Sequence, residues 1–150
     1  MKRWLPITLL LLVSCTNETA LELEITASEA VPAEVASWEL RLYQLAEAEV
    51  CPSAEQAASA ARVGRLAHAQ SFADVGMSVG EIPAGRWGMA VIARDDACGV
   101  RMYGCTVVEI GGDTFSPIPI RVEPATATAT CGGCRTCGAG ACDVVAAVCD

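Results

Sequence analysis

The distribution of cysteines constrains this chain more than any other feature. Nine cysteines occur among 150 residues, and five of them fall in the last 20, where large apolar side chains are almost absent. A segment of that kind cannot build a hydrophobic core, so disulfides or a bound metal must hold it. Nine cysteines are also too many for a reducing cytosol unless they bind metal. We therefore expect an oxidising compartment or a metal centre.

The first 15 residues have the layout of an export signal. Residues 2–3 are basic, 4–13 are mostly apolar, and a small residue then precedes Cys15. About ten apolar residues are too few to span a bilayer, which needs roughly 20. Residues 1–14 are therefore predicted to be a signal peptide that is removed on export.

The end of this segment, Leu-Val-Ser-Cys at 12–15, resembles the lipobox of bacterial lipoproteins. The resemblance implies that the sulfur of Cys15 carries a diacylglycerol, that the leader is cut before Cys15, and that 15–20 is a lipidated tether. Each buried methylene of such a lipid adds ~0.8 kcal/mol of membrane affinity. Thr16 follows the cysteine instead of Asp, which favours the outer membrane under the sorting rule of this family. An ordinary leader with a chance cysteine is the alternative.

The chain is acidic, with 10 basic and 18 acidic residues and a formal net charge of −8. Removing Lys2 and Arg3 with the leader leaves 8 basic residues against the same 18 acids, which gives −10. Nucleic-acid binding needs a basic face that contacts phosphates. We therefore exclude nucleic acid as a partner.

Two segments near the start of the mature chain alternate between apolar and polar residues. This period of two is typical of half-buried strands, and it covers Leu21–Thr26 and Ser37–Tyr43. In the second segment Trp38, Leu40 and Leu42 are expected to face the core. Glu39 and Arg41 are expected to point outward as a solvated face.

The next region is rich in alanine. Ser53 and Gln56 have the spacing of a capping box, which predicts a short helix within Cys51–Ala61, with an ordered loop over 53–61 as the alternative. Arg65–Phe72 alternates weakly, and we interpret it as a strand, although a continued helix is possible.

The clearest strand signals follow. Trp87–Arg94 is apolar on both faces, which is typical of a central strand. Asp95–Gly99 has turn chemistry, and Val100–Ile110 is predicted to return beside the first strand. Ile118, Ile120 and Val122 alternate on a last strand, with Pro117 and Pro119 at the alternate positions.

That last strand, Ile118–Val122, is expected at a sheet edge, because proline cannot donate to a ladder. About six strands with turns between them predict a mainly β domain over 21–123, a small antiparallel β-sandwich. The turn Ile-Pro-Ala-Gly-Arg-Trp at 82–87 resembles the transthyretin-like and carboxypeptidase-regulatory-like family. The resemblance implies a prealbumin or Ig-like sandwich with Trp87 anchoring its core, and many such domains are accessory or adhesive modules.

A low-complexity linker, 124–130, precedes a cysteine-rich module at 131–150. Its C-x2-C-x2-C-x4-C spacing lacks the two separated knuckles of a zinc site, and its last gap is one residue too long for a ferredoxin run. We expect disulfides here, with zinc or an iron–sulfur cluster as lesser alternatives, and assign no metal ligand and no cofactor. The pattern also resembles short cysteine-rich tails of myxobacterial surface proteins.

The odd number of cysteines in the tail predicts a disulfide between the tail and the rest of the chain. If Cys15 carries lipid, eight cysteines remain, three in the β domain and five in the tail, and both numbers are odd. Full oxidation then requires at least one bridge between the two parts, and we expect Cys149 to make it. The expected disulfide cysteines are Cys51, Cys98, Cys105, Cys131, Cys134, Cys137, Cys142 and Cys149.

No catalytic constellation is found in the sequence. His68 is the only histidine, without a nucleophile or acid at triad spacing, and no phosphate-loop or metalloprotease motif occurs. Asp95 and Asp96 could bind calcium with Glu109 or Asp113, but adjacent acids at a turn more often serve the turn itself. We nominate no catalytic residue.

The leading hypothesis is a non-enzymatic, lipid-anchored protein of the cell envelope, in the outer membrane and facing the periplasm or the cell surface. Its role would be binding, adhesive or structural, with the membrane as one partner and an unidentified protein or glycan as another. The first alternative is an accessory module of a carbohydrate- or peptide-processing enzyme. The second is a thiol redox or metal-binding protein that uses the tail.

Overall fold

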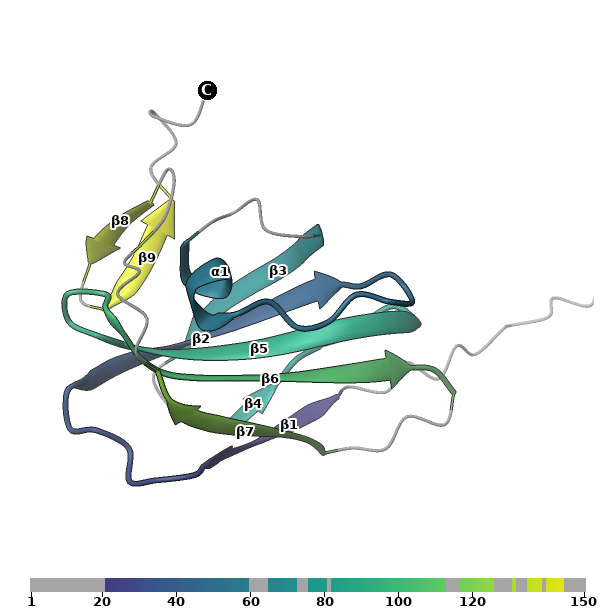
Figure 1. Cartoon of the computed structure of the whole chain (residues 1–150), viewed down its shortest axis with the longest axis horizontal. Helices are drawn as coiled ribbons and strands as arrows, with labels where there is room; N and C mark the ends of the chain where they lie inside the picture. Colours follow the sequence, from purple (N-terminus) through teal and green to yellow (C-terminus); the bar gives the residue numbers. More distant parts are fainter. Residues whose placement is uncertain are drawn as a thin grey trace, which may run out of the picture.

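The computed structural model describes residues 21–59, 65–72, 76–80, 82–112, 117–125, 131, 135–138 and 140–144. The predicted signal peptide, the tether with Cys15, residues 126–130 of the linker, Cys134 and Cys149 lie outside the described residues. The fold is mainly β, with one short helix among these residues (Figure 1). The elements are β1 (Glu22–Ala27), β2 (Val35–Gln44), α1 (Ala54–Ser59), β3 (Arg65–Phe72), β4 (Gly76–Ser78), β5 (Gly85–Asp95), β6 (Val100–Ile110), β7 (Ile118–Pro124), β8 (Arg135–Gly138) and β9 (Ala141–Val144).

Seven strands form one mixed sheet in the order β3-β2-β5-β6-β7-β1-β4, and β8 and β9 form a separate hairpin. The strands from β3 to β6 pair antiparallel. In contrast, β1 runs parallel to β7 from Leu23 beside Ile118 to Ala27 beside Val122. The sheet is therefore not purely antiparallel as the sequence predicted. Local alternation predicts a strand but carries no information on the direction of its partner.

The sheet curls where β6 meets β7. These strands pair only at their ends, at Met102 with Pro124 and Tyr103 with Glu123. Residues from β1 and β7 join residues from β2 and β5 in one core, so the two halves of the curled sheet enclose it. Its buried members are Leu21, Leu23, Trp38, Leu40, Leu42, Val79, Trp87, Met89, Val91, Ala93, Met102, Ile118, Ile120 and Val122.

Trp87 lies in this core, as predicted, with 5% of its surface exposed. Its indole Nε1 donates to the carbonyl of Pro83 at 2.9 Å, which ties the turn before β5 to the strand. A buried indole N–H needs such a partner. This hydrogen bond therefore holds the turn at 82–87 against the core that Trp87 enters.

The edge position predicted for β7 is wrong, because β7 lies between β6 and β1. Pro119 is tolerated there because the half of β7 that contains it pairs with β1, whereas β6 contacts the other end. The backbones of β6 and β7 approach each other closely at Gly104 of β6. A Cβ at Gly104 would overlap the carbonyl group of Arg121.

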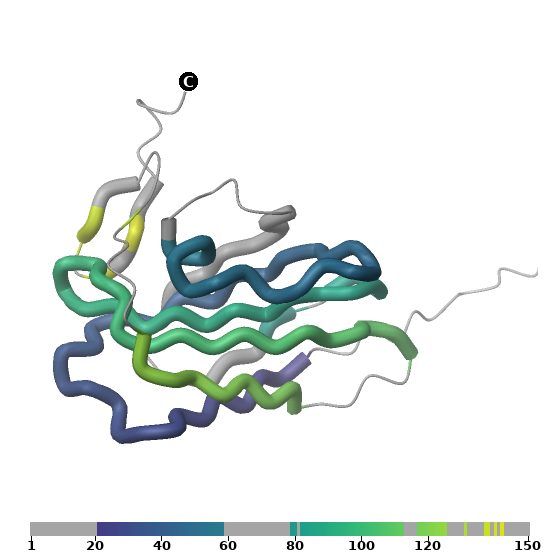
Figure 2. Tube along the Cα trace, viewed as in Figure 1, coloured from purple at the N-terminus to yellow at the C-terminus, as the bar shows by residue number. Residues whose placement is uncertain are grey.

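Helix α1 lies over the outer face of β5 and β6 (Figure 2). Its first turn contains the predicted capping box: the Ser53 N–H donates to Gln56 Oε1 at 2.9 Å, and the Gln56 N–H donates to Ser53 Oγ at 3.2 Å. Ala57 and Ala58 are fully buried beside Ile92. The helix, and not the alternative loop, therefore covers this face.

Candidate functional site

Three disulfides join the cysteines that the structure describes. Cys51 pairs with Cys105, Cys98 pairs with Cys137, and Cys131 pairs with Cys142. The second bridge joins the β5–β6 turn to the tail hairpin, which is the kind of connection that cysteine parity predicts. It uses Cys137, whereas the expected crossing residue Cys149 lies outside the described residues.

The tail hairpin also contacts the sheet through its tight turn (Figure 1, β8 and β9 at the left). The Ser37 hydroxyl donates to the carbonyl of Gly140. Gly140 is buried with a φ of +80°, and a Cβ there would lie 2.9 Å from the Ala36 Cβ and 3.1 Å from the Asp95 carbonyl oxygen. Only glycine satisfies both the backbone conformation and the close approach. The segment after the linker is therefore docked on the sheet.

The β5–β6 turn that holds Cys98 is internally braced. The Asp95 carboxylate accepts from the Gly99 N–H at 2.7 Å and pairs with Arg101 at 2.7 Å. Burial alone would raise the pKa of Asp95, but these partners hold it below its usual value. Cys98 has a φ of 62°, a conformation that few non-glycine residues adopt. Asp95 thus serves the turn. The predicted calcium site with Glu109 is wrong, because Glu109 lies beside Arg86 at the opposite end of β5 from Asp95, and Asp113 lies outside the described residues.

Two bridges meet at this turn. The Sγ atoms of Cys98, Cys131 and Cys142 all lie within 4.8 Å of one another, and Cys137 Sγ is bonded to Cys98 Sγ at 2.06 Å. Cys98 is fully buried and Cys137 is exposed, so the cluster lies at the surface of the junction. Cysteine spacing within the tail did not reveal this cluster, because one of its members, Cys98, comes from the β5–β6 turn.

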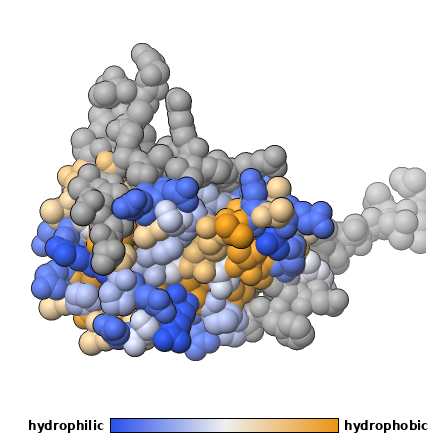
Figure 3. All heavy atoms as spheres, in the orientation of Figure 1, coloured by the Kyte–Doolittle hydropathy of each residue, from blue (hydrophilic) through white to orange (hydrophobic). Residues whose placement is uncertain are grey.

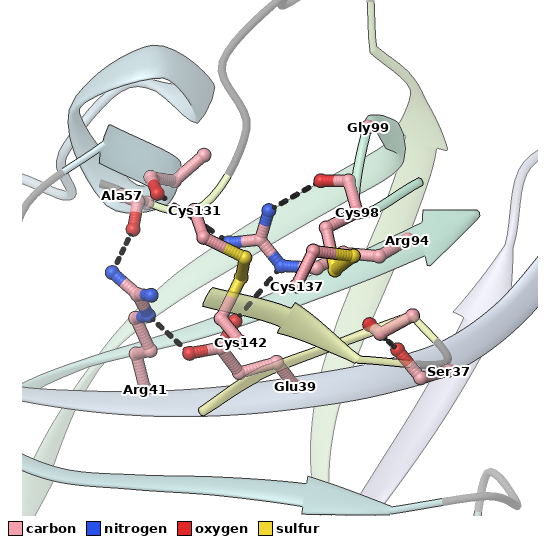
Figure 4. Close-up of polar contacts among 12 residues, drawn as sticks. Ser37, Glu39, Arg41, Ala57, Arg94, Cys98, Gly99, Cys131, Cys137 and Cys142 are labelled. Carbon is pink, nitrogen blue, oxygen red and sulfur yellow. Dashed lines mark hydrogen bonds and ion pairs between the residues drawn. A yellow bond between two sulfur atoms is a disulfide. The ribbon is translucent and has the colours of Figure 1, made fainter. Parts of the chain in front are cut away.

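A cluster of buried charged side chains lies next to these cysteines (Figure 4). This charge cluster consists of Glu39 and Arg41 of β2 and Arg94 of β5. The prediction that Glu39 and Arg41 are solvated is wrong, since they are 3% and 1% exposed. Alternation correctly places them opposite the core, but α1 covers that face as well. The small side chains of α1 leave space for two long arginines.

Each member of this charge cluster is held by hydrogen bonds. Glu39 Oε1 accepts from Arg41 Nε at 2.6 Å, and Oε2 accepts from Arg94 Nε at 3.0 Å. Burial by itself would raise the pKa of Glu39, but the two guanidinium groups outweigh that effect and lower it. The carboxylate therefore stays ionised.

The two arginines also tie neighbouring segments to the sheet. Arg41 donates to the Ala57 carbonyl, and Arg94 donates to the Ala58 carbonyl at 3.4 Å, so both satisfy carbonyls near the end of α1. Arg94 Nη1 donates to the Cys98 carbonyl at 2.9 Å. Arg94 thus links the helix, Glu39 and the cysteine turn. In the sequence, Arg94 is marked only as the single charged residue at the end of the apolar run that forms β5.

An apolar area lies on the face of the sheet that α1 covers, at the end opposite the β5–β6 turn (Figure 3). Val50 and Val107 are exposed by 76% and 38%. A shallow pocket of about 320 Å³ lies between Tyr43 and the loop 45–52. Tyr103 is hydrogen-bonded to the Pro52 carbonyl at 2.5 Å, and burial with the nearby Tyr43 raises the pKa of Tyr103.

His68 lies on β3 opposite Leu42, and its side chain is outside what the structure describes. Within the described part of the chain no helix is long and apolar enough to cross a membrane. No protein-family model matches the chain, and comparison with curated proteins and with solved structures found no significant match. Its function is therefore inferred from its own residues and geometry.

Proposed function

We propose that this protein is a lipid-anchored, exported binding module of the bacterial cell envelope. The observation that carries the proposal is the set of three disulfides, one of which staples the tail to the sheet across 39 residues. Bridges of this kind persist in oxidising compartments. The export signal and the lipobox-like residues 12–15 point to the same location.

The anchor would determine how the domain is displayed. Five residues separate Cys15 from Leu21, and the chain between the two can span at most about 20 Å. Strand β1 begins there and pairs in parallel with β7, so the two strands start at the same end of the sheet. Because β6 runs antiparallel to both β7 and β5, this is the end at which β6 finishes and β5 begins. The β5–β6 turn lies at the other end of β5, whose 11 residues extend for about 35 Å. The tail would then face away from the membrane, and the apolar area around Val50 would lie on the membrane side.

The partner is proposed to be a protein or glycan that binds the membrane-distal end. A curled sheet with a shared core is compatible with the transthyretin-like sandwich that the turn at 82–87 resembles. This compatibility supports, as a second candidate, an accessory module of a carbohydrate- or peptide-processing enzyme. Co-purification of such an enzyme with the protein favours the accessory module over the first candidate.

The anchor is tested by detergent phase partitioning of cells that express the full chain. Wild-type protein is expected in the detergent phase, and Cys15→Ser is expected in the aqueous phase or unprocessed. Ser14→Ala keeps a small residue before the cysteine and serves as the matched control. Recovery of Cys15→Ser in the detergent phase as a cleaved chain overturns the proposal. Thr16→Asp is expected to shift the protein toward the inner membrane.

A further inference from the structure

We propose that Cys98, Cys131, Cys137 and Cys142 form a tetrahedral zinc site when their two disulfides are reduced. This site is distinct from a zinc site within the tail alone, because Cys98 comes from the β5–β6 turn. It goes beyond the proposed function, and it does not depend on the lipid anchor. In the oxidised protein the Cys98–Cys137 disulfide holds the tail to the sheet, and in the reduced protein one metal ion would hold it there.

The positions of the sulfur atoms carry this inference. Three Sγ atoms lie within 4.8 Å of one another, and the fourth is bonded to one of them. A Zn–S distance of about 2.3 Å requires sulfurs roughly 3.8 Å apart at the corners of a tetrahedron. Once the two S–S bonds are broken, the formerly bonded sulfurs need to separate by under 2 Å, and Cys98 Sγ needs to approach the sulfurs of Cys131 and Cys142 by up to about 1 Å. Cys137 Sγ, which is placed by its bond to Cys98, needs to approach those two sulfurs by up to about 3 Å. Side-chain rotation is sufficient for movements of this size.

The surroundings match the charge of such a centre. Four thiolates and one Zn²⁺ carry a net charge of −2. The buried side chains of Glu39, Arg41 and Arg94 together carry +1, and Arg94 contacts the Cys98 carbonyl at 2.9 Å. Nearby guanidinium groups favour thiolates over thiols. A hydrogen-bonded turn with Cys98 at positive φ also holds this ligand in place before metal binds.

The chemistry balances with a dithiol as reductant. Each disulfide accepts two electrons and two protons from one dithiol, which is itself oxidised to a disulfide, so two dithiols yield four cysteine thiols. Zn²⁺ then displaces the four thiol protons as the four Zn–S bonds form. Two small-molecule disulfides can act as oxidants in the reverse direction: each takes two electrons, is reduced to a dithiol and re-forms one bridge, so that Zn²⁺ is released.

The test uses the full mature chain with Cys15→Ser, reduced without oxygen and titrated with Co²⁺. We expect one Co²⁺ per chain, with the thiolate charge-transfer band and the visible bands of tetrahedral cobalt, both lost on adding Zn²⁺. Cys98→Ser is expected to abolish these bands. The matched control, Cys51→Ser with Cys105→Ser, removes the third bridge and is expected to keep them.

Two results overturn the proposal. One is the absence of tetrahedral cobalt bands in the reduced chain. The other is a spectrum that survives Cys98→Ser but is lost in Cys134→Ser, which would place the metal within the tail alone. Cys98→His retains a ligand and is expected to bind cobalt with a weaker charge-transfer band. If reduction weakens the β-sheet circular dichroism signal, Zn²⁺ is expected to restore it, because metal binding contributes folding free energy.

Discussion

Replacing Glu39 by Gln tests whether the buried charges under α1 stabilise the fold. The substitution keeps the shape of the side chain but removes the only negative charge of the buried cluster with Arg41 and Arg94. The new amide NH₂ would face a guanidinium group, so at least one of the bonds at 2.6 and 3.0 Å would be lost. The two arginines would stay buried without their carboxylate.

The expected cost is large for a domain of this size. A hydrogen bond to a charged group contributes ~1.5–3 kcal/mol. Removing one partner of a buried ion pair costs ~3–5 kcal/mol, because the remaining charge has lost water as well as its partner. Glu39→Gln is therefore expected to lower the free energy of unfolding by about 3–5 kcal/mol, out of a typical total of 5–15 kcal/mol.

Urea unfolding at pH 7 with the disulfides intact measures this change. The fluorescence of Trp38 and Trp87, both buried in the core, reports the transition. The matched control is Glu109→Gln, which makes the same change in an exposed pair with Arg86 at 3.0 Å and is expected to cost under about 1 kcal/mol. If Glu39→Gln costs no more than the control, the buried cluster does not stabilise the fold as argued.

Three further predictions concern the same cluster and the tail. The pKa of Glu39 is lowered in the folded protein, so its stabilisation is fully present above pH 4.5 and is lost as pH falls through the folded pKa; urea titrations should show wild type and Glu39→Gln converging only in acid. Replacing Cys98 and Cys137 together by Ser opens a 39-residue loop and should cost ~4 kcal/mol in the unfolding assay, and a loss below about 1 kcal/mol contradicts the bridge. Gly140→Ala should expose the tail to limited proteolysis, whereas Gly112→Ala, which has open space around it, should not; equal cleavage would argue against docking.

The strands were largely predictable because their signals are local. The period of two in β1 and β2, and the apolar run of β5, reflect which face of each strand is buried. The observed bounds of β3 and β6 coincide with the predicted ones. The capping box at Ser53 likewise depends on residues three apart, and it predicted where α1 begins.

Features that depend on distant partners were not predictable in the same way. Alternation placed Glu39 and Arg41 opposite the core but could not show that a six-residue helix covers that face. The parallel pairing of β1 with β7 joins segments almost 100 residues apart. The cysteine cluster combines Cys98 with the tail, so spacing within the tail alone could not define it.

The central claim is that an exported protein staples its tail to the sheet through Cys98 and Cys137. A non-reducing peptide map of the mature protein, isolated from membranes with free thiols blocked, tests it most directly. We expect a peptide in which Cys98 and Cys137 are cross-linked, alongside one that joins Cys51 and Cys105, and a lipid-bearing peptide that begins at Cys15. Recovery of Cys98 as a blocked free thiol, with the tail cysteines bridged only to one another, would contradict the claim.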